Sequence, residues 1–196
     1  MEMSQLEELL LQSLAHERGG VQVYRTALQC VQNEQLREEW TKYHQQTQRH
    51  VTVLEELCGS LHIDPAQKTP GVEVVQGLGQ ALVEAMQRAL AANKPNAAEI
   101  VACECVVLAE TKDHLDWELL VACSKESKRE VQKALQAAAE EIEDEEDEHL
   151  YHSRGWCREL WMKALGLKAV LPPPEETKNV KDAISAARAE KEAHPH

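Results

Sequence analysis

Acidic and imidazole side chains recur on segments of this sequence that are otherwise apolar. Carboxylate and imidazole groups are side chains that can bind metal ions. The set consists of Glu17, His50, Glu110, His114, Glu146 and His149. A carboxylate that is buried in a protein core without a partner is energetically costly. Because four separate segments carry the same exception, we expect them to share one partner, and a multivalent cation is the simplest. The sequence therefore predicts a metal site.

The most compact of these patterns is the E-x-x-H motif of Glu146 and His149. Two residues three positions apart lie on one face of a helix, so this pair can bind one ion or bridge two. A set with many carboxylates and few histidines suits iron or manganese better than zinc or copper. We therefore expect iron, in a two-metal or a mononuclear site, or else manganese. Glu104 is a reserve ligand because its depth along the helix matches that of Glu146.

Long amphipathic helices must position these residues. Ala, Leu, Glu, Gln and Lys dominate the composition, Phe is absent, and no sustained alternating pattern predicts a strand. The fold class is therefore all-α. We expect four long helices at about 4–31, 34–57, 97–123 and 128–153, a shorter one at about 72–92, and a closing helix at 156–165 after Gly155. Asn33 is a helix break or cap, and capping boxes are expected at Ser4–Glu7, Asn96–Glu99 and Ser127–Glu130.

The order of the helices predicts the topology. About 35 residues, which include a helix, separate the first helical hairpin from the second, whereas a tight turn would be much shorter. A long crossover between two hairpins is the connectivity of ferritin-like four-helix bundles. We expect this bundle to occupy residues 1–166, followed by a Pro-containing linker and charged tail at 167–196, outside the core. Gly19 and Gly20 would let a neighbouring helix approach closely.

Charge and hydropathy restrict the partners and the compartment. The formal net charge of −13 argues against nucleic-acid binding and favours attraction of cations. No apolar run reaches the length of a membrane span, and the N-terminus lacks the features of a signal peptide. We therefore expect a cytoplasmic protein. The six cysteines form no CxxC pair, which favours buried reduced thiols.

The residues singled out above resemble the pattern of the ferritin-like superfamily, and in particular small bacterial ferritin-like proteins with a carboxylate-bridged metal site. That family typically carries Glu on its first bundle helix, E-x-x-H on the second, Glu on the third and E-x-x-H on the fourth. In this sequence Glu17 matches the first position and Glu110 the third, while Glu146 and His149 match the fourth. The resemblance extends over about residues 4–153.

The second motif is only half present, because Thr47 stands where the family has Glu, three residues before His50. Threonine is a poor ligand for iron or manganese. Either His114 compensates from the third bundle helix, or one of two sites is weakened, or a single ion binds. His152 would hydrogen-bond to a ligand, and Tyr24 and Tyr43 are either packed core residues or redox-active neighbours of the metal.

The resemblance implies a metal-binding protein that oxidises Fe(II) with oxygen or peroxide, and we expect a homodimer or a higher homo-oligomer. An alternative is a metal-free, stress-related interaction module with the same fold. A third reading, a hemerythrin-like oxygen binder, ranks last, because only His114 and Glu118 match its H-x-x-x-E pattern. The sequence does not assign catalytic residues.

Overall fold

The protein is all-α, as its composition predicts. The computed structural model describes residues 2–177, apart from the side chains of residues 143 and 177, and this part of the chain contains no strand. Its helices are α1 (Met3–Cys30), α2 (Glu34–Ser60), α3 (Pro70–Ala91), α4 (Pro95–Lys125), α5 (Arg129–Ala164) and α6 (Pro174–Thr177). None of the described helices has the length and apolarity needed to cross a membrane.

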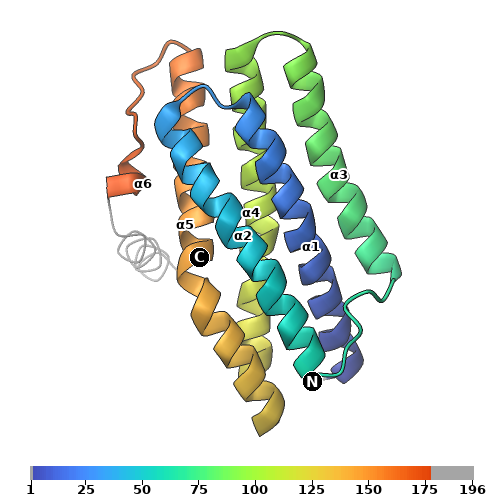
Figure 1. Cartoon of the computed structure of the whole chain (residues 1–196). Helices are drawn as coiled ribbons and strands as arrows, with labels where there is room; N and C mark the ends of the chain where they lie inside the picture. Colours follow the sequence, from blue (N-terminus) through green and yellow to red (C-terminus); the bar gives the residue numbers. More distant parts are fainter. Residues whose placement is uncertain (1, 178–196) are drawn as a thin grey trace, which may run out of the picture.

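Four long helices form a bundle, and α3 lies outside it (Figure 1). Helix α1 packs against α2 and α4, and α5 packs against α2 and α4, so the four helices surround a common interior. Helix α3 runs the length of the bundle along α1 and α4, and it returns the chain to the end from which α2 started. Consequently α1 and α5 point in one direction, and α2 and α4 in the other. The long helical crossover is confirmed.

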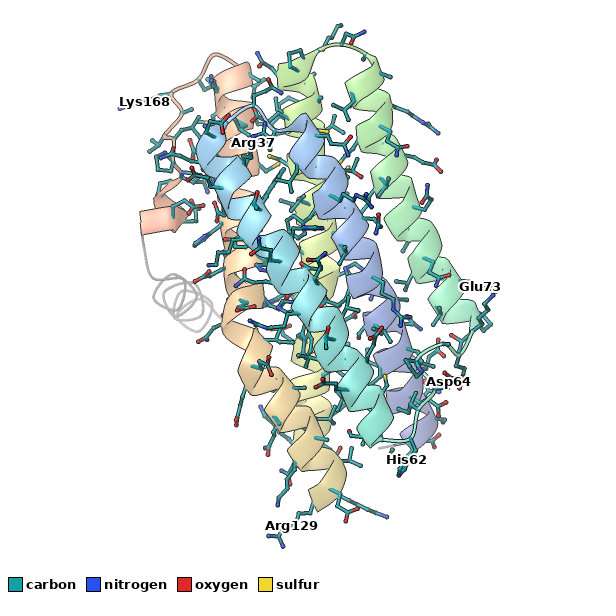
Figure 2. All side chains as sticks on the ribbon, viewed as in Figure 1. Arg37, His62, Asp64, Glu73, Arg129 and Lys168 are labelled. Atoms are coloured by element: carbon teal, nitrogen blue, oxygen red, sulfur yellow. The ribbon has the colours of Figure 1, made fainter. Side chains whose placement is uncertain are left out.

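Two apolar clusters fill the two ends of the interior, and side chains occupy the space between the helices throughout (Figure 2). One cluster contains Leu10, Leu54, Trp117 and Ile142, among others. The second contains Tyr24, Trp40, Val106 and Trp156, among others. On each of the four long helices, the predicted ligands lie between the residues of these two clusters. The polar layer therefore sits at mid-bundle, enclosed from both ends.

The turn between α1 and α2 is anchored to α4. The Asn33 side chain accepts hydrogen bonds from the backbone N–H groups of Gln35 and Leu36, which confirms Asn33 as the cap of α2. The carboxylate of Glu99 accepts from the N–H groups of Gln32 and Asn33, both at 2.8 Å. This buried glutamate on α4 therefore fixes the relative position of the two hairpins.

The three predicted capping boxes are wrong. Ser4 lies inside α1, and Asn96 lies inside α4 because Pro95, whose fixed φ suits the first helical position, already begins that helix. The hydroxyl of Ser127 donates to the carbonyl of Cys123 at the end of α4, and α5 has no side-chain cap. Each motif misses its helix start by one or two residues, which is enough to remove the capping geometry.

Helix α5 continues through Gly155, so the prediction of a separate closing helix at 156–165 is wrong. A Cβ atom at Gly155 would lie 2.9 Å from Cβ of Pro173 and 2.8 Å from a carboxylate oxygen of Glu175. The glycine therefore makes room for the segment that follows α5. Gly166, at φ +71°, ends the helix, and the chain then returns along it to α6.

The expected boundary at residue 166 coincides with this turn, but the following residues do not all lie outside the core. Pro173 is buried, and α6 contacts α5. The expectation of a tail outside the core is therefore wrong for residues 173–176, which are buried or half-buried. The rest of the expected tail, residues 178–196, lies outside the described residues.

The paired glycines of α1 allow the close approach that the sequence predicts. A Cβ atom at Gly19 would lie 3.8 Å from Cα of Gly79 on α3, and a Cβ atom at Gly20 would lie 3.3 Å from Cγ2 of Thr47 on α2. The two glycines therefore serve two different neighbours, the crossover helix on one side and the second bundle helix on the other.

Candidate metal centre

Five of the six predicted ligands converge at mid-bundle. They are Glu17 on α1, His50 on α2, Glu110 on α4, and Glu146 and His149 on α5, and none is more than 3% exposed. They form two groups of three, in each of which one donor atom per residue lies within 4.8 Å of the others. The first group is Glu17, His50 and Glu146, and the second is Glu110, Glu146 and His149. Glu146 belongs to both, which is the position of a carboxylate that bridges two ions.

The spacing of the donor atoms fits metal coordination. Nδ1 of His50 lies 3.3 Å from a carboxylate oxygen of Glu17 and 3.0 Å from Oε1 of Glu146. Nδ1 of His149 lies 3.6 Å from Glu110 Oε2 and 3.6 Å from Glu146 Oε1. Neighbouring ligands of an ion with bonds of about 2.1 Å are roughly 3.0–3.4 Å apart in octahedral or tetrahedral geometry. Small side-chain rotations would bring both groups to these values.

Buried polar atoms without a hydrogen-bond partner mark the interior of the cluster. They include Glu17 Oε2, Glu110 Oε2, both carboxylate oxygens of Glu146, and Nδ1 of both His50 and His149. A buried polar atom is nearly always paired, because leaving it unpaired costs about 1–3 kcal/mol. Six such atoms on five converging residues point to a cation as their common partner. The donor set therefore fits one or two metal ions.

Both imidazole rings are oriented by a contact on the opposite side. Nε2 of His50 donates to Oε2 of Glu145 at 3.0 Å, and Nε2 of His149 donates to the side-chain oxygen of Gln46 at 3.1 Å. Glu145 is itself paired with Arg49 at 2.7 Å. Such outer contacts are typical of metal-ligating histidines, because they place the proton on the far nitrogen and leave the near one for the metal. The sequence analysis did not identify Gln46 or Glu145.

In the metal-free state the cluster retains protons. Burial raises the pKa of Glu146 to about 7, with the carboxylate of Glu110 adding to the effect and His50 opposing it. Burial alone would lower the pKa of His50, but contacts with Glu146 and Glu17 outweigh it and raise the pKa to about 11. A cation that enters the cluster must therefore displace protons.

Asp113 is a further acidic residue of this region that the sequence analysis missed. It lies three residues after Glu110 on α4, is 5% exposed, and its Oδ1 atom has no hydrogen-bond partner. Burial, followed by the charges of Glu146 and Glu17, raises its pKa well above the usual value. The i, i+3 spacing of Glu110 and Asp113 was the signal in the sequence that could have revealed it.

Thr47 adds no donor to the centre. It is buried, its hydroxyl donates to the carbonyl of Tyr43 at 2.9 Å, and its methyl group faces Gly20. On the other side of the layer, Nε1 of Trp117 donates to Glu17 at 3.1 Å and so orients that carboxylate.

His114 does not join the converging residues. Its ring nitrogens lie 3.6 Å from carboxylate oxygens of Asp147 and Glu118, and its ring packs edge-on against Tyr151, near the surface. The reserve ligand Glu104 is exposed and accepts a hydrogen bond from Trp161. The layer therefore draws its α4 carboxylate from Glu110, as first predicted, and no imidazole from α4.

Two tyrosines adjoin His149. The ring centroids of Tyr24 and Tyr43 lie 6.1 and 4.2 Å from that of His149, respectively. The Tyr24 hydroxyl is buried without a hydrogen-bond partner. The Tyr43 hydroxyl contacts His152, whose partners are Tyr43, Glu39 and Glu176, so the prediction that His152 bonds directly to a ligand is not met.

Comparisons with known proteins identify no family and no relative for this chain. No protein-family model matches it, and neither the comparison with curated proteins nor that with solved structures finds a match.

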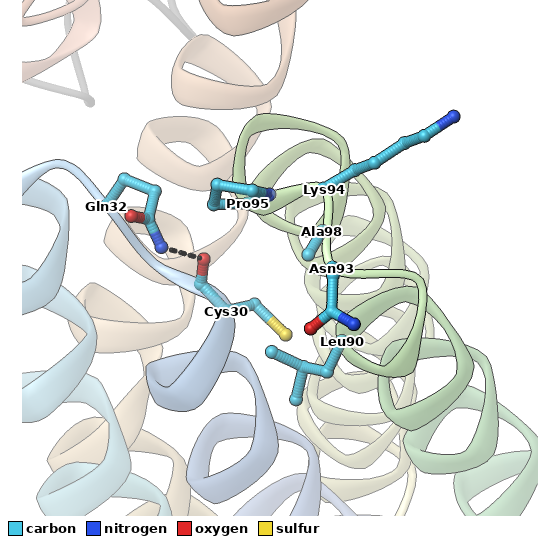
Figure 3. A pocket seen from close by; sticks show the side chains of 7 residues that line it. All are labelled: Cys30, Gln32, Leu90, Asn93, Lys94, Pro95 and Ala98. Atoms are coloured by element: carbon cyan, nitrogen blue, oxygen red, sulfur yellow. Dashed lines mark hydrogen bonds between the residues drawn. The ribbon is translucent and has the colours of Figure 1, made fainter.

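A pocket of about 220 Å³ opens at the end of the bundle, where Cys30, Leu90 and Asn93 face one another (Figure 3). It contains none of the converging residues. The candidate metal centre is therefore formed by the mid-bundle polar residues and not by this pocket.

Proposed function

We propose that this protein binds two iron or manganese ions at mid-bundle, in the manner of ferritin-like proteins, with Glu146 as the shared carboxylate. One observation carries the proposal: six buried oxygen and nitrogen atoms without a hydrogen-bond partner belong to Glu17, His50, Glu110, Glu146 and His149, the residues of the two donor groups. A cation in each of the two donor groups would be a partner for donor atoms of all five residues. The up-down-down-up order of the bundle helices supports the ferritin-like assignment.

The composition of the donor set selects the metal. Three glutamates and two histidines converge, and Asp113 adds a nearby carboxylate. Carboxylate oxygen is a hard ligand, and no cysteine belongs to either donor group. This chemistry favours iron or manganese over copper, and it favours them over zinc sites built from cysteine and histidine.

The same donor set supports oxidation of Fe(II) as the reaction. Anionic oxygen ligands stabilise Fe(III) more than Fe(II), and so make the oxidation of the bound substrate ion easier. Two Fe(II) ions would give two electrons to one O₂, which leaves with two protons as hydrogen peroxide. The protein residues would hold the two ions together, and the protons that the metal-free cluster holds on Glu146 and His50 would leave when the ions bind, so the two protons of the peroxide would come from solvent.

Metal titration tests the binding step. The apoprotein is titrated with Mn(II), and the magnetic-resonance signal of free Mn(II) counts the bound equivalents. We expect Glu146→Gln to bind two equivalents fewer than the wild type. Glu140→Gln is the matched control, because Glu140 is an exposed carboxylate on the same helix, and we expect it to bind as the wild type does. Equal binding by the wild type and Glu146→Gln would refute the mid-bundle centre, and no binding by either would leave the metal-free module.

A separate measurement tests the reaction. Anaerobic protein loaded with two equivalents of Fe(II) is mixed with oxygen, and the near-ultraviolet absorbance of Fe(III) is followed. We expect oxidation at least about tenfold faster than in Glu146→Gln, since loss of the shared carboxylate disrupts both donor groups. Equal rates in the two proteins would limit the function to binding. Circular dichroism confirms that the variant remains helical.

A further inference from the structure

A second group of metal-ligand type lies outside the mid-bundle layer. It consists of Glu39 on α2, His152 on α5 and Glu176 on α6, and one donor atom of each lies within 4.8 Å of the others. These side chains are 10%, 12% and 20% exposed, so the group is nearly enclosed but remains reachable from solvent. None of its members belongs to either mid-bundle group. Three different helices therefore meet at a second polar point.

Three oxygen atoms crowd around one nitrogen in this group. Nδ1 of His152 lies 2.8 Å from Oε1 of Glu39, 3.0 Å from the Tyr43 hydroxyl, and 3.4 Å from Oε2 of Glu176. The Tyr43 hydroxyl donates its own proton to Glu39, and a single proton on Nδ1 can serve only one of the two carboxylates well. The three separations lie close to the roughly 3.0–3.4 Å between neighbouring ligands of an ion with bonds of about 2.1 Å. The geometry thus suits a cation better than a proton.

The charge of the group leads to the same conclusion. Within residues 2–177, the ion pairs of Glu39 and Glu176 run only to His152, so two carboxylates share one imidazole. Nε1 of Trp156 donates to both carboxylates, at 2.8 and 2.7 Å, and draws them together. The buried Nε2 of His152 has no hydrogen-bond partner.

We propose that Glu39, His152 and Glu176 form an outer site that binds one divalent transition-metal ion, with the Tyr43 hydroxyl beside it. Two carboxylates and one imidazole are a donor set for Mn(II), Fe(II) or Zn(II). Because Glu176 belongs to α6, the ion fastens the C-terminal segment to α2 and α5. The outer site does not depend on the function proposed for the mid-bundle layer.

The position of Tyr43 places the two sites next to each other. Its ring lies against His149 of the mid-bundle layer, with centroids 4.2 Å apart, and its hydroxyl contacts Glu39 and His152 of the outer group. One side chain therefore separates the outer ion from the inner centre. An ion held at the outer site would lie on the solvent side of this tyrosine.

Mn(II) titration in the Glu146→Gln background isolates the outer site, because that variant lacks the carboxylate shared by both inner groups. We expect this background to retain about one bound equivalent, and the added change Glu39→Gln to abolish it. Glu38→Gln is the matched control, since Glu38 is the exposed neighbour on the same helix. Glutamine keeps the size of the side chain and one acceptor oxygen for either Tyr43 or Trp156, and circular dichroism checks that the variant keeps its helical fold.

Hydrogen exchange gives a second readout at the other end of the site. We expect Mn(II) to slow exchange of the backbone amides of residues 175–177 at least about threefold in the Glu146→Gln background, and to have no effect after Glu39→Gln. In the wild type, Glu39→Gln should remove one equivalent and leave the inner ones. No bound equivalent in the Glu146→Gln background, or one that resists Glu39→Gln, would overturn the outer site without affecting the inner one.

Discussion

Nδ1 of His50 lies 3.0 Å from Oε1 of Glu146, yet both atoms are buried and neither takes part in a hydrogen bond. The opposite side of the ring is held by Glu145, the residue that precedes Glu146 on α5. Two consecutive residues of α5 therefore contact the two nitrogens of the imidazole: Glu145 lies on the outer side of the ring and Glu146 within the layer. In the proposed metal centre, this arrangement would couple protonation of the layer to the binding of metal.

The first prediction concerns the pH dependence of metal binding. The pKa of Glu146 is raised to about 7 and that of His50 to about 11, so metal must displace protons from both. Mass action then makes the apparent affinity rise with pH, by about tenfold per pH unit for each displaced proton. We expect Mn(II) to bind at least about tenfold more tightly at pH 8 than at pH 6. Calorimetry in buffers of different ionisation enthalpy counts the released protons, and a pH-independent affinity would contradict the prediction.

The second prediction concerns Asp113. Its folded-state pKa is raised by burial and by Glu146 and Glu17, so the ionised carboxyl destabilises the metal-free protein above pH 4. We expect Asp113→Asn to raise the free energy of unfolding of the apoprotein at pH 7 by at least about 1 kcal/mol, and the gain to disappear as the pH falls below 4. Urea denaturation at both pH values measures it. A variant less stable than the wild type at pH 7 would show that the carboxyl is well accommodated.

The third prediction concerns the orientation of His149. Its Nε2 atom donates to Gln46, and loss of such an outer contact typically costs 10–100-fold in metal affinity. We expect Gln46→Leu to weaken Mn(II) binding by about tenfold without removing an equivalent. Gln45→Leu is the control, because Gln45 is the exposed neighbour on α2. If both variants bind as the wild type does, the contact does not orient the ring.

The fourth prediction separates two glycines within helices. Gly77 has no atom within 4 Å of the Cβ position, whereas a Cβ atom at Gly20 would lie 3.3 Å from Thr47. We expect Gly77→Ala to stabilise the protein by about 0.5–1 kcal/mol through helix propensity. Gly20→Ala should gain less or lose stability, because the added methyl group presses on Thr47. Thermal unfolding of the two variants compares them, and an equal gain would show that α1 and α2 separate easily.

Helical periodicity predicted most of the bundle and of its polar layer. Glu17, His50 and Glu146 recur in step with apolar residues, and a helix fixes which positions share a face, so their convergence followed from spacing. Helix ends were predicted less well. A capping box is recognised from two residues, and the Pro95 start of α4 shows how a neighbouring residue shifts the boundary.

By itself, therefore, the sequence determined the all-α class, the long crossover, and five residues on four helices that converge at mid-bundle. Only the tertiary structure decided which of the polar residues near Glu110 on α4 is buried in the layer. Asp113 and His114 are rotated by about −60° and +40° from Glu110 around α4, and spacing alone favours neither. Packing against α1 and α5 sets the rotation of the helix, and it buries Asp113 while leaving His114 near the surface. The outer group is likewise a product of folding, because Glu176 reaches Glu39 only where α6 returns along α5 past Gly155.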